Sequence, residues 1–102
     1  MGGQGEYMEI LKDPLQFEWD HGNKDKNFLK HRVTHQEAEE AFFDPHKRIL
    51  QRNTYEPEDR HLVIGKTKKE RLLFVVFTLR GNKIRVISAR NLNKKERPLY
   101  EK

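Results

Sequence analysis

The sequence predicts a single α+β domain: two N-terminal helices packed on a four-stranded antiparallel sheet, followed by a short C-terminal helix. The chain has 102 residues, the length of one domain with one core. Helix signals come first, over residues 23–42, and strand patterns follow from residue 48, an order typical of α+β domains with antiparallel sheets. Hydrophobic residues make up 34% and charged residues 36% of the chain, so the core must be small.

The N-terminal part contains a leader, a short extended segment and a first helix. Residues 1–15 begin Gly-rich and show no periodicity, so we expect a mobile leader before a single domain over residues 16–102. Phe17 and Trp19 then alternate with charged residues, as in an extended segment. Asn23 is placed to cap a helix over residues 23–31. Its only apolar anchors are Phe28 and Leu29, so it should lie across the core.

The second helix is specified more fully. Thr34 and Glu37 have the spacing of a capping box, in which each side chain bonds the other residue's backbone N–H. Val33 and Ala38 flank the cap as a hydrophobic staple would. The stripe of Ala38, Ala41 and Phe42 should face the core. The helix should end before Asp44-Pro45, because the residue preceding a proline disfavours the α region.

Strand patterns fill most of the second half. Gly81-Asn82 is placed to form a two-residue hairpin turn of type II′. The apolar run just before it is typical of a central strand, and RILQRN suits a sheet edge. Asn93 and Glu96 repeat the capping spacing, but Pro98 requires the last helix to begin near it or to be short and kinked. The expected strands are residues 48–53, 61–66, 72–79 and 84–90, with a loop over residues 54–59.

Composition excludes several classes of protein. Cysteine is absent, so there are no disulfides, thiolate metal sites or cysteine nucleophiles. No apolar run is long enough for a membrane span or a secretory signal, so we expect a soluble cytoplasmic protein without a membrane partner. From Arg60 onward there are 13 Lys/Arg against 3 Asp/Glu, a balance of +10, while the preceding residues balance at −5. Such asymmetry favours a face that meets a polyanion.

Metal and serine chemistry find little support. His31 and His35 lie four residues apart, but the predicted cap at Thr34 separates them, so we expect no metal site and no cofactor. Ser88 is the only serine and lies in a strand without a nucleophile elbow. There is also no glycine-rich phosphate loop.

Metal-free RNA cleavage fits the residues better. The RNA 2′-hydroxyl serves as internal nucleophile, and the protein supplies a base, an acid and cations that stabilise the phosphate. Arg60, Arg85 and Arg90 lie on or beside the predicted sheet, and strand alternation predicts that Arg85 shares a face with Ile87 and Ala89. We expect too little local acid to pair both Arg85 and Arg90. The alternative is that such an arginine bonds a nearby Glu or the acidic helix.

Several residues are candidates for the general acid and the general base of the cleavage reaction. His31 ends the first helix, and a histidine can give a proton to a departing oxygen near neutral pH. Asp59 or Lys30 is then available at the 2′-hydroxyl. The competing interpretation is that His31 only caps the helix.

Several segments, taken in order from Phe17 to Tyr100, resemble the BrnT toxins. The first half contains FEWD, then Asn23, Asn27, Lys30 and His31, then V-T-x-x-E-A and F-x-D-P. The second half contains D-R-H-L-V-I-G, the apolar strand and I-R-V-I-S-A-R followed by E-R. The chain departs from the family pattern at Asp59, where Glu is usual, at His61, where an aromatic residue is usual, and at Pro98.

The resemblance implies a bacterial type II toxin, a small ribonuclease with a RelE-like fold that inhibits translation. It implies neutralisation by a BrnA-like antitoxin, which dimerises and contacts operator DNA; the toxin itself reaches DNA only through it. We expect the antitoxin to cover the basic sheet face. By position, the family's motif residues are Lys30, His31, Asp59, Arg60, Arg85, Ser88 and Arg90. Ser88 and the lysines of the basic half, Lys66, Lys68, Lys69, Lys94 and Lys95, are expected to contact RNA.

Two other classes of function are consistent with the same charge pattern. One is a non-catalytic module that binds nucleic acid or an antitoxin. The other is a structural basic domain. RNA cleavage in EDTA that is lost on substitution of Arg60 or Arg85 separates the ribonuclease from both.

Overall fold

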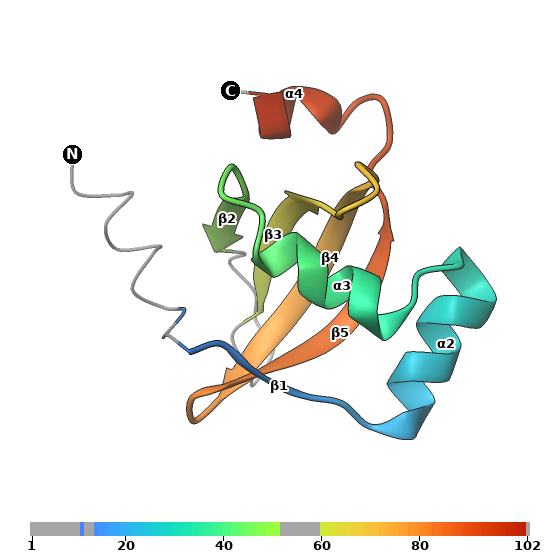
Figure 1. Ribbon diagram of the computed structural model, residues 1–102, viewed down its shortest axis with the longest axis vertical. Coiled ribbons are helices and arrows are strands. Elements are labelled where there is room, and N and C mark those ends of the chain that lie inside the picture. Colours follow the sequence, from blue (N-terminus) through green and yellow to red (C-terminus); the bar gives the residue numbers. More distant parts are fainter. Residues whose placement is uncertain (1–10, 12–13, 52–59, 102) are drawn as a thin grey trace.

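The structure is a computed structural model that describes residues 11, 14–51 and 60–101, without the side chains of His21, Asn23 and Gln51 (Figure 1). The rest of the predicted leader and the predicted loop 54–59 lie outside the described residues. The elements in chain order are β1 (Gln16–Glu18), α2 (His21–His31), α3 (His35–Phe42), β2 (Arg48–Gln51), β3 (His61–Lys66), β4 (Leu72–Arg80), β5 (Lys83–Asn91) and α4 (Arg97–Glu101).

The strands form one mixed sheet in the order β1-β5-β4-β3-β2. The predicted antiparallel pairing of the four later strands is confirmed, with β4 central and β2 at an edge. The prediction of a purely antiparallel four-stranded sheet is wrong, because β1 adds a fifth strand that runs parallel to β5. Strand β1 has only three residues and its partner is far away in the sequence. Its alternation of apolar and charged residues is therefore too short to predict that it joins the sheet.

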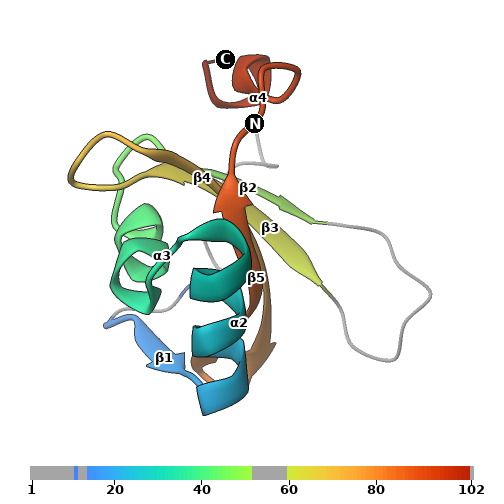
Figure 2. The ribbon, with the colours of Figure 1, turned by 90° about the vertical axis from the view of Figure 1, so that its right-hand side faces the viewer.

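Helix α2 lies beside β5 and begins earlier than predicted (Figure 2). The carbonyl of Asp20 accepts the first helical hydrogen bond, from Lys24 N–H at 3.3 Å, so Asn23 lies inside the helix rather than at its cap. Phe28 and Leu29 are exposed, which contradicts their predicted role as core anchors. The buried residue is instead Asn27, whose Oδ1 accepts the Ala89 N–H of β5 at 3.2 Å.

Helix α3 forms as predicted and packs on β3 and β4. Both hydrogen bonds of the Thr34–Glu37 capping box are present, and Ala38, Ala41 and Phe42 are buried. The helix approaches β3 closely at Gly65, where a side-chain carbon would collide with the Ala41 carbonyl. Gly65 therefore sets the distance between the helix and the sheet.

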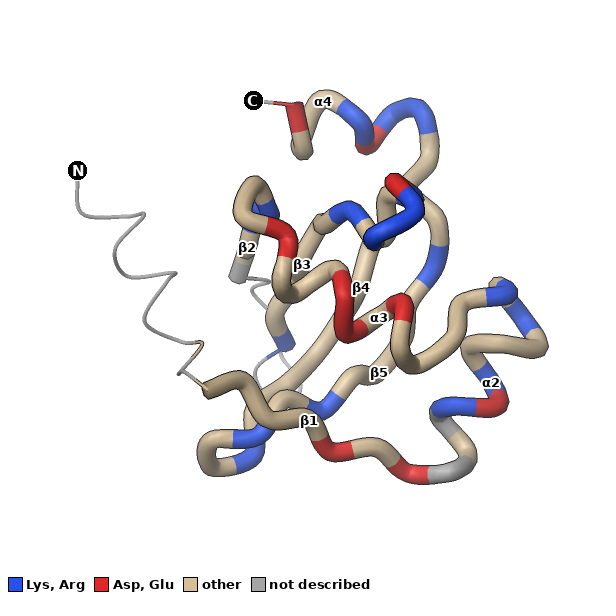
Figure 3. The backbone as a smooth tube through the Cα atoms, in the orientation of Figure 1, with Lys and Arg blue, Asp and Glu red and all other residues tan. Residues whose placement is uncertain are grey.

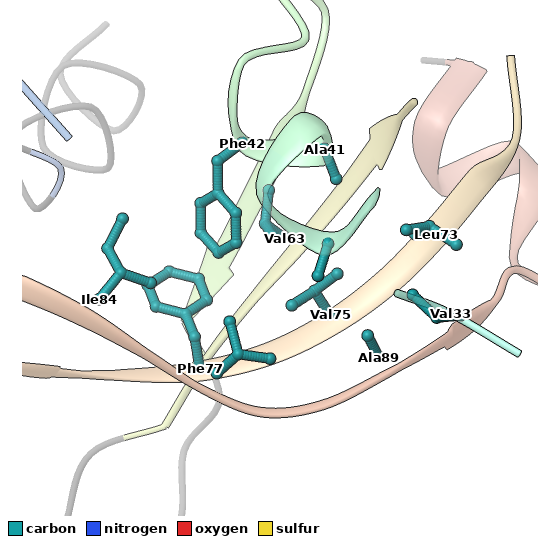
Figure 4. Packing of buried hydrophobic residues seen from close by; sticks show 11 residues of the cluster. Val33, Ala41, Phe42, Val63, Leu73, Val75, Phe77, Ile84 and Ala89 are labelled. Carbon is teal, nitrogen blue, oxygen red and sulfur yellow. The ribbon is translucent and has the colours of Figure 1, made fainter. Parts of the chain in front are cut away.

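The core lies between α3 and the sheet (Figure 4). Phe42 and Phe77 meet edge to face, with ring centroids 5.0 Å apart, and Phe17 of β1 packs on Phe42 at 5.3 Å. Leu11 and Leu15, from the predicted leader, also pack against this core.

Strand β5 contains a bulge. Ser88 pairs with Val76 and Val86 pairs with Phe77, so Ile87 is an extra residue without a partner on β4. As a result Ile84, Val86 and Ala89 are the buried positions of the strand. The prediction that Arg85 shares a face with Ala89 is therefore wrong. The Gly81-Asn82 turn is as predicted, with Gly81 at φ 60°.

The C-terminal segment is anchored by polar contacts. Asn93 and Glu96 bond each other's backbone N–H at 3.0 Å, and α4 begins at Arg97, next to Pro98, as one of the two predicted alternatives required. The helix buries none of its residues. Within the described residues, no helix is long and apolar enough to cross a membrane.

Candidate active site

The sheet face turned away from α3, which we call the distal face, gathers four of the predicted site residues: Lys66, Arg85, Ser88 and Arg90. Phe74, Val76 and Thr78 alternate along β4 and point to this face; their partners on β5 are Arg90, Ser88 and Arg85. Thus the bulge brings these three β5 residues to one face. By register, β2 and β3 contribute Arg48, Leu50, Leu62, Ile64 and Lys66.

Arg90 is held in a fixed orientation. Its Nη1 and Nη2 donate to the two carboxylate oxygens of Glu96 at 2.9 and 2.7 Å, and Nη1 also donates to the Asn91 carbonyl. Its guanidinium lies 3.9 Å from the centroid of the Phe74 ring. The hydrogen bond to Arg90 lowers the pKa of Glu96, and the same bond raises the pKa of Arg90, so both groups are charged. Within the described residues, nothing accepts from Nε–H of Arg90.

Arg85 is paired through the segment around β1. Its Nη2 donates to Asp20 at 3.1 Å, and its Nη1 lies 3.7 Å from a carboxylate oxygen of Glu18. The expectation that local acid would not pair both arginines is therefore wrong. The carboxylates that pair Arg85 belong to Glu18 and Asp20, which are remote in sequence, and the one that pairs Arg90 belongs to Glu96, beyond the end of the strand. The residue pattern of a strand gives no information about such partners.

The remaining predicted residues occupy different parts of the molecule. Ser88 is half-buried between the two arginines on β5, and Arg60 is half-buried immediately before β3. Asp59 lies outside the described residues. Lys94 and Lys95 are exposed in the turn before α4, close in sequence to Glu96. Lys68 and Lys69 are exposed in the β3–β4 turn, which bonds toward α3 through Lys68 N–H and Glu40.

Lys30 and His31 end α2, at the edge of the sheet. Lys30 is exposed and His31 is half-buried, and in the described part of the chain the His31 ring makes no hydrogen bond. The carbonyl of His31 accepts from Arg71 Nη2 at 3.1 Å, and Arg71 Nε donates to Asn91, the neighbour of Arg90. Arg71 thus links the end of α2 to the end of β5.

Sequence reasoning missed three groups that shape this region: Arg71, Glu96 as a partner of Arg90, and the pair formed by Asp44 and Tyr100. Asp44 is buried, and its carboxylate accepts from His46 N–H, Lys66 N–H and the Tyr100 hydroxyl, the last at 2.7 Å. Burial opposes its ionisation, but these hydrogen bonds hold the pKa of Asp44 below its usual value. The only sequence signals were the Asp-Pro pair that ends α3 and the near-terminal position of Tyr100.

Charge is sorted between the elements (Figure 3). Acidic residues gather on α3 and on the β1–α2 segment, and basic residues on α2, the β-turns and the C-terminal segment. Over residues 14–51 and 60–101, no three His, Asp or Glu side chains form a group that could hold a metal ion.

The fold and the site together describe a small α+β domain whose sheet presents two arginines on one face, and arginine is the side chain best suited to bind phosphate. The model of a family described as "Ribonuclease toxin, BrnT, of type II toxin-antitoxin system" matches residues 19–96, so the chain belongs to the BrnT family of ribonuclease toxins. The fold is similar to the crystal structure of the Brucella abortus ribonuclease toxin BrnT, with a TM-score of 0.59 and 19% identity, covering 78% of this chain and 99% of that one. No curated protein matches the sequence.

Proposed function

We propose that this chain is a metal-independent endoribonuclease whose distal face binds RNA, with Arg90 at the scissile phosphate and Arg85 at a neighbouring one, and whose RNA cleavage stops translation in the cytoplasm. Membership of a ribonuclease toxin family supports RNA as the target. The proposed reaction begins when the 2′-hydroxyl attacks the adjacent phosphorus. The bond from phosphorus to the 5′-oxygen then breaks, leaving a 2′,3′-cyclic phosphate and a 5′-hydroxyl.

The orientation of Arg90 carries this proposal. Glu96 takes one edge of the planar guanidinium through both terminal nitrogens. The other edge, which has Nε–H and the second Nη2 hydrogen, donates to no residue in the described ranges. Two parallel N–H groups on one edge match two phosphate oxygens, and arginine binds phosphate in this bidentate way. A carboxylate behind the guanidinium therefore leaves a phosphate-binding edge in front of it.

Arg85 supplies a second cation on the same face. Within the described residues it donates to Asp20 through Nη2 and its Nη1 lies 3.7 Å from Glu18, so its Nε–H is left for an incoming phosphate. Arg85 and Arg90 pair with Thr78 and Phe74, which are four residues apart on β4, so about 13 Å of strand lies between them. Arg90 therefore stabilises the charge that develops on the scissile phosphate, and Arg85 binds a neighbouring phosphate. Ser88, between them, is placed to donate a hydrogen bond to the RNA backbone.

We propose His31 as the acid that protonates the departing 5′-oxygen, with Asp59 or Lys30 acting at the 2′-hydroxyl and Arg60 assisting. The link from Arg71 to the His31 carbonyl on one side and Asn91 on the other supports a fixed position of α2 relative to β5. Single-turnover cleavage by His31→Gln across pH tests this: an unchanged rate and pH profile removes His31 from the mechanism.

The central experiment is cleavage of a labelled RNA oligonucleotide by the purified protein in EDTA. We expect cyclic-phosphate products, no cleavage of the same oligonucleotide with 2′-O-methyl riboses, and loss of cleavage in folded Arg90→Ala. Arg90→Lys keeps the charge but not the bidentate edge, so it should also be slow. Wild-type rates for Arg90→Lys would refute the bidentate role.

The ion pairs favour one alternative, a non-catalytic binding module. Glu18, Asp20 and Glu96 neutralise part of the positive charge of both arginines, as expected if the face only docks a partner. RNA binding without cleavage in the experiment above would establish this alternative.

The partner that we propose is a BrnA-like antitoxin, since the family is a toxin of type II toxin–antitoxin systems. It would cover the distal face, which neutralises the cations and blocks the site together, and it would carry the complex to operator DNA. A complex that still cleaves RNA at the rate of the free protein would refute this placement.

A further inference from the structure

We propose a second phosphate-binding subsite on the distal face, at the corner where β2, β3 and α4 meet, which binds a backbone phosphate of the RNA some distance from the cleaved bond. This inference rests on the proposed RNA binding. The corner is a hollow of about 470 Å³. It is lined by His46, Arg48, Lys66, Tyr100 and Glu101.

The subsite lies in register with the cleavage end. Arg48 pairs with Ile64, Ile64 with Phe74, and Phe74 with Arg90, so these four residues form one row across the strands. Lys66 is two residues beyond Ile64 on the same face and is a diagonal neighbour of Arg48. Three strand spacings of about 4.8 Å separate the two ends of the row, roughly 14 Å. A single scissile phosphate cannot reach both ends, but a longer RNA crossing the strands can.

Asp44 builds the frame of the hollow. Its Oδ1 accepts from His46 N–H at 2.9 Å, and its Oδ2 accepts from Lys66 N–H at 2.8 Å and from the Tyr100 hydroxyl. One buried carboxylate therefore joins the α3–β2 turn, the end of β3 and α4. This brings the side chains of His46 and Lys66 to the rim beside Arg48, while the charge of Asp44 is taken up by these three donors.

Lys66 distinguishes this corner from the arginine pair. Its ammonium lies 5.9 Å from the centroid of the Tyr100 ring, and over the described residues it forms no ion pair with a carboxylate. Arg85 and Arg90 each have a carboxylate partner. A phosphate arriving at the corner therefore gains a half-buried cation without displacing an acid, although Glu101 stands at the rim on the exposed end of α4.

The test compares substrates that do and do not span the row. Cleavage of a dinucleotide and of an octanucleotide is measured for wild type, Lys66→Met and Arg48→Met. The matched control, Lys83→Met, removes a cation of the β4–β5 hairpin. For the octanucleotide, Lys66→Met and Arg48→Met should raise KM roughly tenfold with kcat retained. The slope of log KM against log salt should fall by about 0.7 for each lost phosphate contact. Dinucleotide cleavage should not change, and Lys83→Met should match wild type for both substrates.

Two measurements keep the outcome decisive. Thermal unfolding of each variant identifies loss of fold, and Lys66→Gln repeats the test if Lys66→Met is destabilised. The affinity for a 2′-O-methyl octanucleotide, which the proposed reaction cannot cleave, measures binding at the subsite separately from catalysis. Weaker binding by folded Lys66→Gln supports the subsite even if the wild type proves to be inactive. Wild-type affinity and salt slope in both Lys66 variants would overturn the subsite and leave the ribonuclease proposal intact.

Discussion

The carboxylate of Glu96 accepts hydrogen bonds from both terminal nitrogens of the Arg90 guanidinium, at 2.9 and 2.7 Å. The same carboxylate accepts the Asn93 N–H and so belongs to the cap that precedes α4. The cap and the arginine therefore share one side chain, and the position of Arg90 depends on how the C-terminal segment turns.

Glu96→Gln should lower kcat for RNA cleavage about tenfold without raising KM. The amide retains one acceptor oxygen but loses the charge that fixes Arg90 against Phe74, so the phosphate-binding edge is no longer aimed. The measurement is steady-state cleavage, with Glu70→Gln in the exposed β3–β4 turn as the control. If Glu96 only competed with RNA for Arg90, the variant would instead cleave faster, which would contradict its positioning role.

Arg71→Lys should lower the free energy of unfolding by about 1–2 kcal/mol, because lysine cannot replace the forked contacts of Arg71. Arg71 binds the carbonyls of His31 and Arg32 at the end of α2, and its Nη1 is 3.0 Å from Glu37. Urea denaturation measures the loss, with Arg80→Lys in the hairpin as a control that should stay near wild type. A loss no larger than that of the control would show that these contacts add nothing to stability.

The same position predicts an acid dependence. Burial raises the pKa of Glu37, but its bonds to Thr34 and Arg71 outweigh burial and hold it below the usual 4.5. A lowered carboxyl pKa contributes stability that is complete above the unfolded value and is lost as the pH falls through the folded value. Part of the wild-type stability should therefore disappear below about pH 4.5, and Glu37→Gln should show a shallower loss in the same range.

Tyr100→Phe should reduce stability by about 1 kcal/mol at neutral pH, since Asp44 loses one of its three donors. Burial, the hydrogen bond to Asp44 and its charge raise the pKa of Tyr100 from 10.0 to about 12. A raised pKa gives stability that is complete below pH 10 and is lost as the pH rises toward 12. The difference in stability between wild type and Tyr100→Phe should therefore shrink over this range. Leu99→Ala on the same helix is the control; a constant difference between wild type and Tyr100→Phe would refute the bond.

Gly65→Ala should cost about 2 kcal/mol or more, because the new methyl group would collide with the Ala41 carbonyl and push α3 from the sheet. Gly22→Ala provides the comparison within one molecule: its nearest neighbour would be Asp20 Oδ1 at 3.5 Å, and alanine favours the helix. Thermal denaturation should show a large fall in Tm for the first variant and none for the second. Equal Tm values would mean that the helix can move without loss.

What could be predicted from the sequence was local. The Thr34–Glu37 cap, the Ala38–Phe42 stripe and the Gly81 turn each depend on residues a few positions apart, and all three are present. The antiparallel strands were also clear, since their apolar patterns are long. The family was identified from the order of these segments, and the family model confirms it.

What could not be predicted depends on contacts between distant residues. Asn27 is buried because the edge of β5 offers it the Ala89 N–H, 62 positions along the chain. Asp20 reaches Arg85 across 65 positions, so the arginine is paired by an acid that no strand pattern connects with it. For the same reason Phe28 and Leu29, apolar and adjacent, were taken for core residues although α2 turns them outward.

The bulge at Ile87 is what places Arg85 and Arg90 on the same face of the sheet. Arg85 and Arg90 are an odd number of residues apart, and in an unbroken strand such a pair points to opposite sides. They share a face only because one residue between them, Ile87, has no partner on β4. Deleting Ile87 would remove the bulge and leave every other pairing with β4 unchanged, so both arginines would stay on the distal face. If Ile87 were instead paired with β4 in an unbroken ladder, Arg90 would point into the apolar interior, so a shift of register by one residue would separate the two arginines without changing a single side chain.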